Sequence, residues 1–351
     1  MEGPPTDPSG TRHQILIPGK TFLVGEYLAL DGGPSIVLNT GPCFEFTWER
    51  ENSGSPSKDS SYIHHPFHEA SPAGRWLNSI ETPFAGSDYS IQFKDPYKGK
   101  GGLGSSTAEF AGAWFFKRWL TRKAEWSTEV PVVGSLEDHR ESVAPNWNSE
   151  RFGSHRFRDL LDDYWATKAL GSGADLVSQV TGGVAVWDGR VDEMRRYAWP
   201  FPDLALSLYM TGKKMATHTH LAGVPSLDES AIEEMRLWVD DATQSFALAD
   251  ADRLIASVRG FGKVLESRGR VAEHTSALLE ILSDFSGVRA AKGCGAMGSD
   301  VVAVLHDRSA SAELKTFETE NGLVRAATDV DLWTSGATFV RADCVLETSV
   351  S

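Results

Sequence analysis

The chain has 351 residues, of which 41% are apolar and 23% charged, an ordinary composition for one large or two medium globular domains. Its 34 basic and 48 acidic residues give a net charge of −14. Because phosphate groups repel so acidic a chain, this charge argues against non-specific binding to nucleic acid or anionic lipid. Three scattered cysteines, Cys43, Cys294 and Cys344, suit neither a disulfide framework nor a CxxC metal site, and we expect reduced thiols.

The N-terminal third of the chain predicts strands. Residues 1–12 are polar and proline-rich, lack the apolar segment of a signal peptide, and are expected to be a disordered lead-in. Segment 14–47 alternates apolar runs with Gly and Pro, which predicts several successive strands. The Ser- and Pro-rich residues 48–75 predict a surface insert. No stretch approaches the ~20 apolar residues of a membrane-spanning helix, so we expect a cytoplasmic protein without a membrane partner.

The rest of the chain predicts mixed helices and strands. A glycine cluster at 99–104 precedes a helix over 105–123, and a polar stretch, 123–156, separates it from a helix that starts near Phe157. A short helix (174–180) and a strand (182–187) precede a composition break at 188–203, our candidate domain boundary. The remaining segments predict a strand (204–210), a helical region (228–282), a glycine loop (293–298), a strand (300–306), a helix (311–322) and a last strand (337–343). This is an α+β chain in two halves.

The sequence GGLGSSTAEF at 101–110 is the central motif. Glycines allow the backbone to approach a ligand closely, and the following helix offers unpaired N–H groups and the positive end of its dipole to an anion. Hydroxyls of Ser105 and Ser106 can bind phosphate oxygens or Mg²⁺, which prefers oxygen ligands. The alternative is that Ser106 only caps the helix, with Glu109 completing a capping box.

Two further glycine loops accompany this motif. In IPGKTFLVGEYLALDGG, residues 17–33, Lys20 follows Pro-Gly and is placed to point a compact charge at a phosphate. In AAKGCGAMGSDVVAVL, residues 290–305, small residues precede a buried strand. Each loop also has a plain structural interpretation: a solvated turn lysine in the first and a tight turn in the second.

In this order, the three loops resemble the motifs of the GHMP small-molecule kinase superfamily, over most of the chain. Within it the chain is most similar to the bacterial phosphomevalonate kinases, through GEY at 25–27, Lys100 before the loop, GSGAD at 171–175 and TGK at 211–213. Segment 291–300 resembles the third motif of these kinases, but Cys294 replaces the usual serine, and Met297 and Ser299 replace glycines. Lys214-Met215-Ala216 replaces Pro-Ala-Ser. These departures put the exact substrate in question more than the kinase chemistry.

The resemblance implies a two-domain GHMP kinase architecture. Residues 13–195 would form an N-terminal domain similar to the second domain of ribosomal protein S5, and residues 196–351 a ferredoxin-like C-terminal domain. The active site would lie in the cleft between them, with ATP and Mg²⁺ as cofactors. Its partner would be a small phosphorylated or hydroxylated acid, and a homodimer is left open.

The resemblance also assigns roles to residues. Asp175 is the candidate base and Lys20 the group that stabilises charge on the transferred phosphate; the structural alternative for Asp175 is an acid in a helix's first turn. Ser106 is the candidate Mg²⁺ ligand, and whether Lys213 or Lys214 contacts the substrate is open. The expected ATP-binding residues are Lys100, Gly102, Leu103, Gly104, Ser105, Ser106 and Thr107, and the expected substrate-binding residues are Tyr27, Ser172, Gly173, Lys213, Thr217, Gly295, Ala296 and Asp300.

The implied activity is ATP-dependent phosphorylation of (R)-5-phosphomevalonate to 5-diphosphomevalonate in the mevalonate route to isoprenoids. Two alternatives stay open: a mevalonate kinase or another GHMP kinase that phosphorylates an alcohol, and a nucleotide-binding protein without turnover. The acceptor decides how much Asp175 must do. An alcohol needs a base, worth about 10²–10⁴-fold in rate, whereas a phosphate monoester with a second pKa of ~6 arrives largely ionised.

Overall fold

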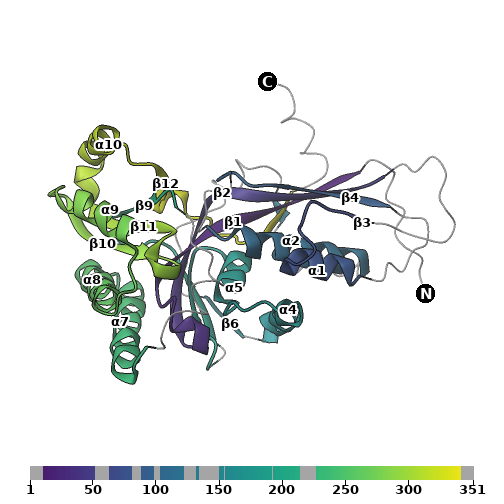
Figure 1. The fold of residues 1–351 in the computed structure, drawn as a ribbon, viewed down its shortest axis with the longest axis horizontal. Coiled ribbons are helices and arrows are strands. Elements are labelled where there is room, and N and C mark those ends of the chain that lie inside the picture. Colours follow the sequence, from purple (N-terminus) through teal and green to yellow (C-terminus); the bar gives the residue numbers. More distant parts are fainter. Residues whose placement is uncertain are drawn as a thin grey trace.

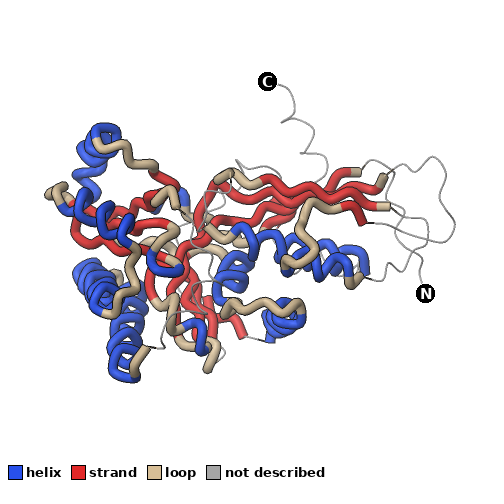
Figure 2. Tube along the Cα trace, viewed as in Figure 1, coloured by secondary structure: helices blue, strands red, loops and turns tan. Residues whose placement is uncertain are grey.

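The computed structural model describes residues 11–51, 63–80, 88–98, 103–121, 132–133, 150–153, 155–191, 193–213 and 227–340. Two β-sheets and their covering helices form an α+β protein, as the sequence predicts (Figures 1 and 2). The first sheet contains the long strands at the right of Figure 1, and the second lies at the left among the C-terminal helices. Among the described residues, no helix is long and apolar enough to cross a membrane.

The first sheet is built around two long antiparallel strands, β1 (Arg12–Val24) and β2 (Pro34–Arg50). Its strand order is β5-β13-β1-β2-β7-β8-β6, with β4 paired to β2 and β3 to β4. The remaining strands are β3 (Ile63–His64), β4 (Tyr89–Lys94), β5 (Val132–Val133), β6 (Glu150–Gly153), β7 (Val184–Asp188), β8 (Glu193–Tyr197) and β13 (Thr338–Val340).

Helices cover one face of this sheet (Figure 2). They are α1 (Pro72–Asn78), α2 (Ser105–Thr121), α4 (His155–Ala166) and α5 (Ala174–Thr181). The apolar face of α2 packs on β2, where the rings of Phe116 and Trp48 lie 5.8 Å apart in an edge-to-face contact. Gly112 allows this close approach, because a Cβ there would lie 2.1 Å from the Phe46 ring. The sheet therefore fixes the position of α2, whose first residues belong to the glycine motif.

The second sheet has the order β10-β11-β9-β12, all antiparallel. Its elements in chain order are β9 (Leu204–Met210), α7 (Glu229–Leu248), α8 (Ala251–Ser267), α9 (Glu273–Ser283), β10 (Val288–Cys294), β11 (Val301–Asp307), α10 (Ser311–Glu320) and β12 (Arg325–Thr328). Strand, helices, two strands, helix, strand is the order of a ferredoxin-like unit. Asp228 and Asp250 cap α7 and α8 by accepting backbone N–H groups, so the predicted helical region begins after Asp228 and is divided at Asp250.

Several predicted segments differ from the structure. The insert predicted over 48–75 includes the end of β2, the short β3 and the start of α1. Segment 188–203 is no bare linker, because β8 within it pairs with β7, and the boundary expected between residues 195 and 196 falls inside this strand. Gly293, predicted in a loop, lies in β10. The last strand, β13, leaves the second half of the chain and pairs with β1 in the first sheet.

Candidate active site

Lys20 lies on β1 beside an irregularity in the strand. The register between β1 and β2 shifts between Ile17 and Gly19, where the three β2 residues 41–43 lie opposite the single β1 residue Pro18. The Lys20 side chain is 11% exposed, and its Nζ lies 4.9 Å from the ring centroid of Phe22. Its backbone N–H donates to the carbonyl of Leu103 at 2.9 Å. The predicted phosphate-contacting lysine is therefore attached directly to the glycine motif.

The described part of the glycine motif runs from Leu103 to Phe110. Gly104 has φ +87°, and a Cβ there would lie 2.6 Å from Cγ of Lys20. Helix α2 begins at Ser105, so the interpretation of Ser106 as the N-cap is wrong: it lies in the first turn, with an exposed side chain. The Thr107 hydroxyl donates to the Gly104 carbonyl at 3.1 Å, and the Ser105 hydroxyl to Glu109 Oε1 at 3.3 Å. Exposed Ser106 at the helix N-terminus is free to meet an anion.

Gln179, on α5, joins the elements of this site and was missed by the sequence analysis. Its buried Nε2 donates to the Pro18 carbonyl at 2.8 Å and to the Gly104 carbonyl at 3.2 Å. One amide thus connects Pro18 of β1, the glycine motif and α5. A signal was present in the sequence, because Gln179 is four residues after Asp175 and shares its face of the helix.

Asp175 lies opposite Lys20. Its Oδ2 is 3.5 Å from Lys20 Nζ, longer than the roughly 2.7–2.9 Å of a tight charged hydrogen bond. Its Oδ1 accepts the Leu176 N–H at 3.0 Å in the first turn of α5, and the side chain is 19% exposed. Burial, and then the charge of Asp175, raise the pKa of the nearby Tyr164 hydroxyl. Asp175 therefore has both of the predicted features, a helix-terminal acid and a partly exposed carboxylate beside Lys20.

Two of the residues predicted to bind substrate in the first half lie next to Asp175, and the third, Tyr27, lies at the third glycine loop. Ser172 and Gly173 immediately precede α5, and Gly173 takes φ +78° at its N-cap. The Ser172 hydroxyl accepts the Ala174 N–H at 3.3 Å. Tyr27 follows β1. Its hydroxyl accepts, at 3.2 Å, the backbone N–H of Met297 in the third glycine loop. Tyr27 therefore connects the first half of the chain to the third loop.

The predicted substrate residues of the second half form one cluster. Asp300 covers Gly295, where a Cβ would lie 2.2 Å from the Asp300 carboxylate. The Thr211 hydroxyl donates to the Ser299 carbonyl and, at 3.3 Å, to that of Asp300, so the turn that carries exposed Lys213 is attached to this loop. Ala296 begins the short helical turn Ala296–Gly298 between β10 and β11. Lys100, Gly102, Lys214 and Thr217 lie outside the described residues.

The third loop and the first half meet at a second contact, also missed by the sequence analysis. Glu26, beside Tyr27, forms an ion pair with Lys292 of β10, with Nζ–Oε1 at 2.7 Å. Burial raises the pKa of Glu26, although the charges of Lys292 and Lys20 oppose this. Burial also raises the pKa of the adjacent Cys294 thiol to about 11, which disfavours the thiolate form that reacts and binds metals. Lys292 belongs to the third glycine loop sequence, but the sequence does not reveal its partner.

The residues present fit a bound nucleotide with a magnesium ion. Gly104, where no side chain can be accommodated, and the N-terminus of α2 suit a phosphate chain. The described residues contain no group of three or more His, Cys, Asp or Glu that would make a protein-only metal site. Mg²⁺ is instead usually bound by substrate phosphates with one or two protein oxygens, and the Ser106 hydroxyl is available for this.

Comparison with known proteins finds the same fold in several kinases. A scan of protein-family models gives no match, and no curated protein matches in sequence. Among solved structures, Streptococcus pneumoniae phosphomevalonate kinase matches with a TM-score of 0.65 and 14% identity, covering 90% of this chain and 98% of its own. Methanococcus jannaschii mevalonate kinase matches with a TM-score of 0.59 and 14% identity, covering 92% of this chain and 99% of its own. Homoserine kinase from Cytophaga hutchinsonii matches with a TM-score of 0.59 and 11% identity, covering 95% of this chain and 99% of its own.

These matches span nearly the full length of each kinase. The chain thus has the fold of the GHMP small-molecule kinases, as the three sequence motifs predicted. Three different acceptors are named among these structures, so the shared fold by itself does not select one of them.

Proposed function

We propose that this protein is an ATP-dependent small-molecule kinase and that its acceptor is (R)-5-phosphomevalonate. The observation that supports the kinase chemistry best is the Lys20–Asp175 pair, 3.5 Å apart beside Gly104 of the glycine motif. A lone capping acid would need no lysine opposite it, and a phosphate-binding loop alone would need no carboxylate. A cation, a carboxylate and a phosphate loop together are what phosphoryl transfer requires.

In the proposed reaction an acceptor oxygen attacks the γ-phosphorus of ATP, and the bond from this phosphorus to the bridging oxygen of ADP breaks. The N–H groups at the start of α2 and the Ser106 hydroxyl bind the phosphate chain. The Lys20 ammonium stabilises charge on the transferred group, and Mg²⁺, when bound, neutralises phosphate charge. Asp175 Oδ2 orients the acceptor and takes its proton if it is an alcohol; with an ionised phosphate it only orients.

The choice of a phosphorylated acceptor is supported by the sequence motifs and by one neighbour. A structure of S. pneumoniae phosphomevalonate kinase in complex with phosphomevalonate and AMPPNP matches with a TM-score of 0.67 and 13% identity. Exposed Lys213, tied to the third loop through Thr211, offers positive charge for the acceptor's phosphate or carboxylate. We further propose two domains, with the division placed after β8 so that this strand stays in the first sheet.

The test is ADP release by the purified protein with ATP and Mg²⁺, with (R)-5-phosphomevalonate, (R)-mevalonate and homoserine offered separately. Turnover with phosphomevalonate alone is expected. Turnover with mevalonate or homoserine alone would overturn the proposed acceptor but support the proposed kinase activity. ATP binding without turnover on any acceptor would favour the nucleotide-binding alternative. The D175N variant should turn over the proposed acceptor more slowly, while D284N, at an exposed carboxylate in the second half, should behave as the wild type.

A further inference from the structure

A buried ion pair connects the two halves of the molecule. Lys292 lies on β10 of the second sheet, and Glu26 lies in the turn that follows β1 of the first. Their side chains are 1% and 6% exposed, with Nζ and Oε1 2.7 Å apart. Both charges are thus removed from water, in contrast to the partly exposed Lys20–Asp175 pair.

The surroundings of this pair are largely apolar. Lys292 Nζ lies 5.4 Å from the ring centroid of Phe261 and 3.7 Å from Sγ of Cys294. The second oxygen of Glu26, Oε2, is buried and has no hydrogen-bond partner among the described residues. Replacing such a pair by apolar residues often leaves stability unchanged or improves it, so stability alone does not explain why charges lie here. The best-attested use of buried polar groups is to fix one register.

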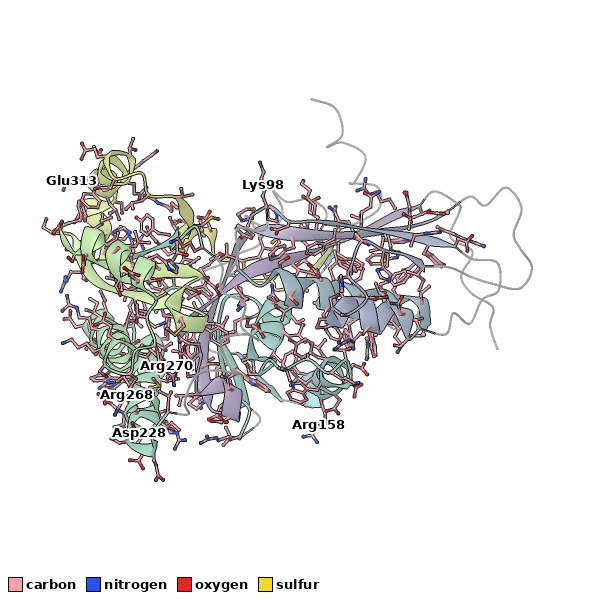
Figure 3. The ribbon with its side chains drawn as sticks, in the orientation of Figure 1. Lys98, Arg158, Asp228, Arg268, Arg270 and Glu313 are labelled. Atoms are coloured by element: carbon pink, nitrogen blue, oxygen red, sulfur yellow. The ribbon has the colours of Figure 1, made fainter. Side chains whose placement is uncertain are left out.

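Two neighbouring contacts show which register would be fixed. Tyr27, next to Glu26, accepts the Met297 N–H, and the Met297 carbonyl accepts the Ala272 N–H at 2.9 Å. Arg270, just beyond α8 (Figure 3), lies with its guanidinium carbon 5.7 Å from the Tyr27 ring centroid. The turn after β1 is thus attached to β10 by Glu26 and to the third loop by Tyr27.

The same turn is continuous with Lys20. Strand β1 carries Lys20 and ends at Val24, two residues before Glu26. A shift of Glu26 relative to β10 would therefore move Lys20 relative to the third loop. The charges of Asp175, Lys20, Glu26 and Lys292 alternate in sign, and Lys20 is close enough for its charge to act on Glu26.

We propose that Glu26 and Lys292 are positioning residues for phosphoryl transfer: their ion pair holds the third loop, residues 295–300, in fixed register with Lys20. This inference rests on the proposed function, because its effect on rate requires that an acceptor lies between the loop and Lys20. Neither side chain touches a reacting atom. A directional ion pair fixes the two halves at one position, whereas apolar contacts at the same place would allow them to slide.

The test uses the full-length E26Q/K292M variant, which removes both charges and leaves neither one buried alone. We expect a melting temperature close to that of the wild type and an ATP Kd within about threefold. We expect kcat to fall at least tenfold, because the acceptor and Lys20 lose their register. The matched control is E318Q/R325M, which removes an ion pair between α10 and β12 within the second half and should leave kcat unchanged.

A second measurement does not depend on turnover. Hydrogen exchange of residues 295–300 should be at least tenfold faster in E26Q/K292M, while β11 should exchange as in the wild type. A purely structural role would leave this local exchange unchanged at equal melting temperature. Wild-type exchange together with wild-type kcat in E26Q/K292M would overturn the inference. If the wild-type protein transfers phosphate to no acceptor, the proposed function fails, and the exchange rates alone decide whether the pair holds the loop.

Discussion

Two lysine–carboxylate pairs involve β1 and its following turn, and they differ in the distance between the charges and in their exposure. Lys20 and Asp175 are 3.5 Å apart, with 11% and 19% of their side chains exposed. Lys292 and Glu26 are 2.7 Å apart, with 1% and 6% exposed. The side chains of the first pair are partly exposed and accessible to a ligand, whereas those of the second are buried and closed to ligands. Pairs of the same chemistry thus have different access to a ligand, according to how deeply the fold buries them.

The largest effect is expected at the loose pair. D175N should lower kcat by about 10²–10⁴-fold for an alcohol acceptor, because the base is lost, and by less for an ionised phosphate acceptor. Its melting temperature should stay near that of the wild type. Steady-state kinetics with each acceptor measure this, and a D175N variant with full kcat on every acceptor would remove Asp175 from the mechanism.

At the closed pair the effect should appear in stability. K292M leaves the Glu26 carboxylate buried without its partner, so we expect the free energy of unfolding to fall by about 3–5 kcal/mol. Urea denaturation measures this, with K315M, at an exposed position on α10, as the control. Equal stability of K292M and K315M would mean that the fold does not need Lys292 to offset the buried charge of Glu26.

K20M sharpens the contrast between the two lysines. Removal of one group that stabilises transition-state charge typically costs about 10²–10³-fold in kcat. Because this pair is long and partly exposed, the free energy of unfolding should change by only about 1 kcal/mol. Paired kinetic and denaturation measurements on K20M and K292M test the division of roles. A K20M variant that loses stability while it keeps its kcat would reverse it.

The smallest effect concerns the glycine next to Lys20. G104A forces a side chain into a position with φ +87° and within 2.6 Å of Lys20 Cγ. The strain, about 1–3 kcal/mol, should weaken ATP binding roughly tenfold in a calorimetric titration. The control is G322A, with φ +64° and no atom within 4 Å of its Cβ. If both variants bind ATP equally well, the close approach at Gly104 does not matter for the nucleotide.

Local patterns in the sequence predicted much of the fold. Alternating apolar runs marked β1 and β2, and glycine followed by helical spacing marked α2 and α5. Strand β13 was predicted as a strand, but its partner was not, because pairing between residues 14–16 and 338–340 leaves no local trace. Strand β8 lies in a polar segment and was taken for a boundary. Such segments become strands through their neighbours more than through their composition.

The candidate site likewise contains residues that local motifs predicted and residues that they did not. Lys20, Gly104 and Asp175 were predicted from motifs, and the structure brings them together. Gln179 and the Lys292–Glu26 pair were not predicted, because each depends on residues more than 70 positions apart in the chain meeting in space. Not every lysine near the motifs belongs to the site: Lys98 is exposed on the far side of the first sheet from α2 and α5 (Figure 3).

The return of β13 to the first sheet has a consequence for the synthesis of the chain. Strand β1 leaves the ribosome long before residues 338–340 of β13, with which it pairs. Gly182, which ends α5, packs so closely on Gly336 that a Cβ there would lie 2.2 Å from the Gly336 nitrogen. Domains usually fold in order as they emerge. Here the first sheet cannot be completed before the second half has been translated, and a chain released early would expose an unpaired, aggregation-prone strand edge.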